Sequence, residues 1–224
     1  MSAQSSDRST PNFWTRDIIA ILLFNAAYLL FSAYVAMGRR NAEFAFYLAV
    51  MVILGACLMI VHHRARLSIG VLWCLSLWGL LHMAGGLMPV PESWPIDGDI
   101  RVLYSWWIIP DLLKYDQLVH VYGFGVTTWV CWQGVRAILA DRAHCSREEI
   151  QPTFGILLVC VAAGMGFGAL NEVVEFIAVL TIPNTNVGGY INTGWDLVSN
   201  GIGCVLAALV VRWGSVTKKT QVAS

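Results

Sequence analysis

Long apolar runs alternate with short polar segments along the whole chain. Six such runs cover residues 17–37, 43–61, 68–88, 116–138, 153–182 and 193–213. Each reaches or approaches the roughly 20 residues that an α-helix needs to cross the hydrocarbon core of a bilayer. The pattern predicts an all-α membrane protein built as a six-transmembrane-helix bundle.

The polar segments around these runs predict the domain organisation. Residues 1–16 are polar, rich in Ser and Thr and without hydrophobic periodicity, which indicates a disordered cytoplasmic tail. Residues 17–213 form one six-helix membrane domain, and residues 214–224 form a second cytoplasmic tail. The longest connection, 89–115, contains several Trp and Tyr residues. Because such rings favour the headgroup level, we expect it to lie along the outer interface and to cover the mouth of any site there.

Composition separates this chain from soluble proteins. Hydrophobic residues make up 57% of it and charged residues 12%, about half the charged share of a soluble domain. The net charge is zero and no basic block is present, which excludes nucleic-acid binding through phosphate contacts. The six cysteines show no CxxC spacing, so neither a zinc site nor a redox pair is indicated.

The distribution of Lys and Arg predicts the orientation. Ten of the 14 cations fall in the tails and in the connections after the second and fourth runs, all on one side of the membrane. The other side carries only Arg39, Arg40, Arg101 and Lys114. The positive-inside rule therefore places both termini in the cytoplasm and makes this a multi-pass inner-membrane protein. Arg39 and Arg40 are the pair that departs from the rule.

Polar residues within the runs are costly in lipid, and their spacing is informative. Asp116 and His120 are four residues apart and Glu172 and Glu175 three apart, so each pair shares a helix face. A third helical stripe, at four-residue steps, consists of Asn192, Asp196 and Asn200. Further polar residues within the runs are His82 and Asn171.

Antiparallel threading of the six runs brings these groups to similar depths in the outer half of the membrane. Each central charge costs roughly 2.5–3.5 kcal/mol on insertion scales, and the two cations within the runs, Arg136 and Arg212, lie near their inner ends, away from the carboxylates. The carboxylates must therefore be protonated, hydrated in a cavity or bound to a cation. We expect one shared constellation of Asp116, His120, Glu172, Glu175 and Asp196.

This constellation suits acid–base or metal chemistry. His120, oriented by Asp116, is a candidate general base. Glu172, Glu175 and Asp196 are candidate ligands for an oxygen-preferring divalent cation such as Mg²⁺ or Mn²⁺. The catalytic candidates are thus His120, Asp116, Glu172, Glu175 and Asp196, and the supporting residues are His82, Asn171, Asn192 and Asn200. The GxxxG spacing of Gly164 and Gly168 predicts close approach of another helix.

Three strings carry a resemblance to known families. They are Lys114-Tyr-Asp-Gln-Leu-Val-His120, Asn171-Glu-Val-Val-Glu-Phe176 and Asn192-Thr-Gly-Trp-Asp-Leu-Val-Ser-Asn200-Gly-Ile-Gly203. They resemble the YjdF-like family of bacterial inner-membrane proteins, a family without an established activity, and more distantly a VanZ-like motif pattern. Gln117 stands where the VanZ-like pattern often has Lys, and no Arg precedes Asp196. The resemblance implies a multi-pass protein of the bacterial inner membrane and supplies no reaction.

Three classes of function remain open at this point. An enzyme would act at the outer site on a lipid-linked or envelope substrate, and the protein would be in contact with membrane lipids. A proton- or cation-coupled transporter would need polar residues that continue to the inner face. A membrane scaffold would use the same polar groups only to hold helices together.

Overall fold

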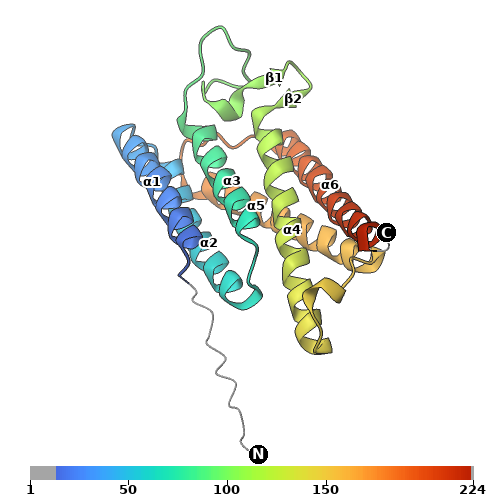
Figure 1. Cartoon of the computed structure of the whole chain (residues 1–224). Helices are drawn as coiled ribbons and strands as arrows, with labels where there is room; N and C mark the ends of the chain where they lie inside the picture. The colour runs from blue at the N-terminus through green and yellow to red at the C-terminus, as the bar shows by residue number, and fades with distance from the viewer. Residues whose placement is uncertain (1–13, 223–224) are drawn as a thin grey trace, which may run out of the picture.

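The computed structural model describes residues 14–222, with side chains described as far as residue 215, and this part of the chain is mostly helical. Its six α-helices are α1 (Arg16–Gly38), α2 (Ala42–Ala65), α3 (Ile69–Leu87), α4 (Tyr115–Ala143), α5 (Phe154–Thr181) and α6 (Tyr190–Val222). Two 3-10 turns, η1 (Leu103–Ser105) and η2 (Arg147–Glu149), and two short strands, β1 (Trp107–Ile109) and β2 (Leu113–Lys114), complete it. The predicted N-terminal tail falls largely outside the described residues, and α6 continues beyond the predicted sixth run (Figure 1).

Local capping explains where four of the helices begin. A Ser, Thr or Asn side chain precedes each of α1, α2, α3 and α5 and accepts a hydrogen bond from a backbone N–H of the first turn, as N-caps do. These caps are Thr15, Asn41, Ser68 and Thr153. The short polar connections between the apolar runs therefore contain the signals that divide them into separate helices.

Five of the six helices are long and apolar enough to cross a membrane: α1, α2, α3, α5 and the Tyr190–Ser215 part of α6. Large apolar side chains on them face outwards, such as Leu30, 71% exposed, and Phe31, 68% exposed. Such extensive exposed apolar surface is typical of contact with lipid rather than water. The predicted fourth span also forms a helix, the 29-residue α4, but its composition is more polar than that of the other five.

Helix α4 lies at the centre of the packing. It contacts α3, α5 and α6, while α1 packs on α2 and α3 (Figure 1). Glycines set the closest approaches: a Cβ at Gly125 of α4 would lie 3.1 Å from the carbonyl oxygen of Gly203 of α6. On α5, Gly164 packs against Thr128 and Gly168 against Asn200, which confirms the close helix approach predicted from their spacing.

The segment between α3 and α4 adds a feature that the all-helical prediction lacks. Strands β1 and β2 pair antiparallel and form a small hairpin at one end of the bundle (Figure 1). Its turn has Pro110 in the second position and Asp111 at φ 58° in the third, features of a type II turn. The Arg101 guanidinium donates hydrogen bonds to the carbonyls of Pro91, Glu92 and Trp94, at 2.6–2.9 Å, and so fixes the preceding loop.

Candidate functional site

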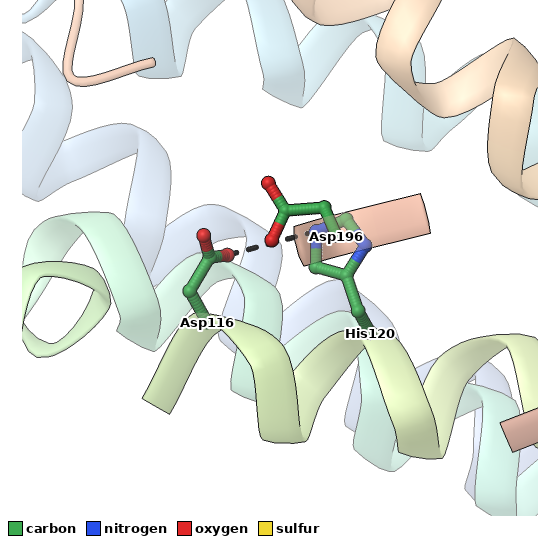
Figure 2. A group of neighbouring side chains, drawn as sticks. All are labelled: Asp116, His120 and Asp196. Atoms are coloured by element: carbon green, nitrogen blue, oxygen red, sulfur yellow. Dashed lines mark ion pairs between the residues drawn. The ribbon is translucent and has the colours of Figure 1, made fainter. Parts of the chain in front are cut away.

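His120 occupies the centre of a buried polar cluster. It lies on α4 one turn after Asp116, and its Nε2 is 3.6 Å from Asp116 Oδ1 (Figure 2). Its Nδ1 lies 2.9 Å from the amide oxygen Oδ1 of Asn200 on α6 and 3.9 Å from Glu172 Oε1 on α5. Because an amide oxygen only accepts, this contact assigns a proton to Nδ1, while Nε2 faces the Asp116 carboxylate. Three helices thus fix one imidazole in a defined orientation.

Asn192 connects the two aspartates at the beginning of α6. Its Nδ2 donates to Asp196 Oδ2 at 2.6 Å and to Asp116 Oδ2 at 3.4 Å. Its Oδ1 accepts from the ammonium of Lys114, the residue before α4, and the same ammonium pairs with Asp97 Oδ2 at 3.2 Å. Asp196 is only 1% exposed, so this chain of contacts runs from a buried carboxylate towards the hairpin end of the bundle.

The α5 carboxylates complete the cluster. Glu175 Oε1 accepts a hydrogen bond from Asn171 Nδ2 at 2.9 Å, one turn earlier on the same helix. Both oxygens of Glu172 and Oδ1 of Asp196 are buried and have no hydrogen-bond partner among the described residues. A buried oxygen left without a donor is costly, and a carboxylate oxygen especially so. These atoms are therefore available to a ligand that the protein itself does not provide.

The geometry divides the acidic residues into two sets that share His120. Asp116, His120 and Asp196 form one, and His120, Glu172 and Glu175 form the other. Within each set the ligand atoms lie within 4.8 Å of one another. The three carboxylates predicted as a single metal site, Glu172, Glu175 and Asp196, thus fall into different sets. His120 joins them because the crossing of α4 with α5 and α6 puts the imidazole between the carboxylates.

His82 lies apart from both sets. Its Nδ1 is hydrogen-bonded to the phenol of Tyr104, from the segment before the hairpin, and its ring lies 5.6 Å from the Tyr47 ring. Burial raises the pKa of Tyr104 well above its ordinary value, so the phenol stays protonated and donates to His82. His82 is thereby an acceptor held among aromatic rings, in a supporting position at the edge of the site.

A cavity of about 300 Å³ opens beside the cluster. Asp116, Glu175, Asn192 and His82 line it from the helices, and Tyr104 and Ser105 line it from the α3–α4 connection. Ser105 Oγ accepts from Asn186 Nδ2 in the α5–α6 connection at 3.3 Å, which ties the two connections together over this end of the bundle. Residues of the predicted covering segment, among them Tyr104 and Ser105, therefore line the cavity, whereas its neighbouring Trp106 and Trp107 do not.

Two charged residues of this region carried no predicted role in the site. In the sequence analysis Lys114 serves only as one of the cations that predict the membrane orientation. In the structure its side chain is 6% exposed and contacts both Asp97 and Asn192. Glu43, in the first turn of α2, is also 6% exposed, and its Oε2 accepts from the Asn186 backbone N–H at 2.9 Å. The position of Lys114, two residues before Asp116, was an available signal. Nothing in the sequence near Glu43 points to a partner 143 residues away.

These features define a multi-helix membrane protein with a buried His/Asp/Glu cluster under a cover of loops. The family model described as "Predicted membrane protein (DUF2238)" matches residues 18–216, and the chain belongs to that family. The match includes every residue of the cluster. No curated protein and no solved structure matches the chain.

Proposed function

We propose that this protein is a divalent-cation-dependent enzyme of the bacterial inner membrane that acts on a lipid-linked or envelope substrate at the outer face. The observation that carries the proposal is the pair of ligand sets that share the buried His120, beside a cavity of about 300 Å³. Three carboxylate oxygens without a hydrogen-bond partner support the presence of a cation, because a cation would offset their burial.

The proposed chemistry divides the carboxylates between binding and proton transfer. With Mg²⁺ or Mn²⁺ held by Asp116, His120 and Asp196, Glu172 and Glu175 remain beside it as proton acceptors. A bound cation would polarise a carbonyl or phosphoryl oxygen and lower the pKa of a water molecule. The reaction class is hydrolysis: the water oxygen bonds to the electrophilic carbon or phosphorus as the bond to the leaving oxygen breaks, a carboxylate takes the proton of the water, and the resulting carboxylic acid returns a proton to the leaving oxygen.

The finer topology belongs to the same proposal. We infer a six-span bundle with both termini in the cytoplasm, because ten of the 14 Lys and Arg residues lie on that side. Packing supports α4 as a membrane span in addition to the five apolar helices, because its neighbours α3, α5 and α6 shield its polar residues from lipid. The site would then lie in the outer half of the membrane, under the hairpin segment (Figure 1).

Two alternatives fit less well. A transporter needs a polar path to the inner face, but the hydroxyls that follow along α4, on Tyr122, Thr127 and Thr128, all donate to backbone carbonyls at 2.9–3.1 Å. A scaffold network would hydrogen-bond its buried carboxylates across helices, whereas Oδ1 of Asp196 has no hydrogen-bond partner among the described residues and the contact of Glu172 with His120 is 3.9 Å long. The resemblance to the VanZ-like motif pattern involves the same polar residues as the candidate site, and this resemblance stays a prediction.

Metal analysis of the detergent-purified protein tests the proposal. The wild type is expected to bind Mn²⁺ or Mg²⁺ in titrations, and Asp196→Asn and Asp116→Asn to lower the affinity at least tenfold. Glu148→Gln is the matched control, because Glu148 is an exposed acid of η2 outside both ligand sets. Cellular lipid profiles, read at equal expression, are expected to change with the two site variants alone. If all three variants bind the cation as the wild type does, or none changes the lipid profile, the proposal is wrong.

A further inference from the structure

The two cations that contradict the positive-inside rule lie together beside the candidate site. Arg39 and Arg40 form the turn between α1 and α2, at the hairpin end of the bundle. Arg40 has φ 51°, a left-handed conformation that is unfavourable for a residue with a Cβ. A turn that only connected two helices would not require two arginines on the side of the membrane that the positive-inside rule disfavours, or a strained backbone at Arg40. We therefore looked for a ligand that these residues could bind.

A second cavity lies against these two arginines. It has a volume of about 290 Å³, and Arg39, Arg40, Asn41 and Ala42 contribute to its wall. Arg39 Nη1 donates to the carbonyl of Leu87 at 2.7 Å, which anchors its guanidinium at the end of α3. Arg40 forms no ion pair with any residue in the described part of the chain. The amino end of α2 adds partial positive charge to the same cavity.

The arginine cavity adjoins the cavity of the candidate site. Glu43, Phe44 and Asn186 line both, so one thin wall separates the two. Glu43 is the one acidic residue lining the arginine cavity, and its Oε2 is engaged by the Asn186 backbone N–H at 2.9 Å. The two cavities thus differ in charge: carboxylates dominate the first, and two guanidinium groups dominate the second.

We propose that Arg39 and Arg40 bind the phosphate group of a lipid whose scissile portion enters the first cavity. This inference rests on the proposed function and names its substrate class as a phosphate-bearing lipid. Two guanidinium groups at a helix amino end are suited to phosphate, because guanidinium groups bind its oxygens in pairs.

Apolar side chains favour a lipid over a soluble phosphate. Ile100 and Ile182 line the arginine cavity, and Ile100 is 44% exposed. On the last turns of α1, shortly before Arg39, Tyr34 and Met37 are 76% and 75% exposed. An acyl chain attached to the phosphate would continue along this outward-facing apolar surface into the surrounding bilayer.

Binding of dihexanoyl phosphatidic acid to the purified full-length protein, measured by thermophoresis, tests the inference. Arg40→Gln is expected to weaken binding at least tenfold. Arg40→Asn keeps a residue that tolerates positive φ and is expected to lose binding equally while folding normally. Arg64→Gln is the matched control, because Arg64 is an exposed cation at the opposite end of α2. Inorganic phosphate and dihexanoylglycerol are each expected to bind at least tenfold more weakly than the phosphatidic acid.

The outcomes separate this inference from the proposed function. Equal lipid binding by Arg40→Asn and Arg64→Gln would overturn the arginine site, whatever the metal content. Inorganic phosphate binding as tightly as the lipid would overturn the lipid assignment. Mn²⁺ affinity, measured on the same preparations, is expected to be unchanged in both variants because Arg40 belongs to neither ligand set. Loss of lipid binding with retained Mn²⁺ binding supports the inference, and a wild type that binds the lipid but no cation refutes the proposed function alone.

Discussion

The approach of α4 to α6 at Gly203 offers a direct test of how the fold holds the site. A Cβ added at Gly203 would overlap the backbone carbonyl oxygen of Val121 and lie 3.0 Å from its Cα. Neither atom can move without displacing α4. Gly203 follows Asn200 by three residues on the same helix face, so a displacement here acts directly on the contact between Asn200 and His120.

The magnitude follows from these distances. Non-bonded heavy atoms in contact lie about 3.5–4.0 Å apart, and the added Cβ would overlap the Val121 carbonyl oxygen, so Gly203→Ala must separate the two helices by more than roughly 1 Å at this point. Overpacking of this kind costs about 1–3 kcal/mol. The same movement stretches the 2.9 Å hydrogen bond between His120 and Asn200 towards its limit. Hydrogen bonds between membrane helices contribute roughly 0.6–1.7 kcal/mol. We expect a total loss of about 2–4 kcal/mol in the free energy of unfolding.

Gly201→Ala is the matched control, two residues earlier on α6. A Cβ there meets only the flexible Met165 side chain, at 3.4 Å from its sulfur, so we expect a change within about 0.5 kcal/mol. Unfolding of both variants in the same detergent, together with Mn²⁺ titration, measures the difference. Equal stability of Gly203→Ala and Gly201→Ala would show that the helices do not meet closely here, and the reasoning would fail.

Two further predictions concern the topology and the opposite end of the bundle. Reporter fusions at Ser224 and within residues 89–115 are expected to report opposite sides of the membrane, and the same side for both would refute the inferred orientation. Arg147→Gln is expected to lower the melting temperature, because Arg147 Nη1 donates to the Ala65 carbonyl at the end of α2 at 2.6 Å and a charged hydrogen bond of this kind contributes about 1.5–3 kcal/mol. Arg142→Gln, an exposed neighbour, is the control, and an equal melting temperature for the two variants would contradict the assigned role of Arg147.

The sequence by itself determined the class of protein and the positions of its helices. The apolar runs had to become helices, because only helices satisfy every backbone hydrogen bond within a lipid-exposed segment. Helical periodicity also put Asp116 with His120, and Glu172 with Glu175, on common faces, since side chains three or four residues apart are neighbours. These properties depend on residues that are close in sequence, so the sequence of one chain is enough to predict them. The chemical role of the cluster stays a prediction.

Tertiary structure alone decided how these faces meet. The division of the carboxylates into two sets sharing His120 depends on the crossing of α4 with α5 and α6, which Gly125, Gly203 and Gly168 permit. Glu43 lines the cavity of the site and accepts a hydrogen bond from Asn186, 143 residues away. Hydrophobic periodicity cannot specify such contacts, because lipid-facing and protein-facing sides of a membrane helix are both apolar. The close approach of backbones at glycines, and the pairing of polar groups across helices, fix the arrangement instead.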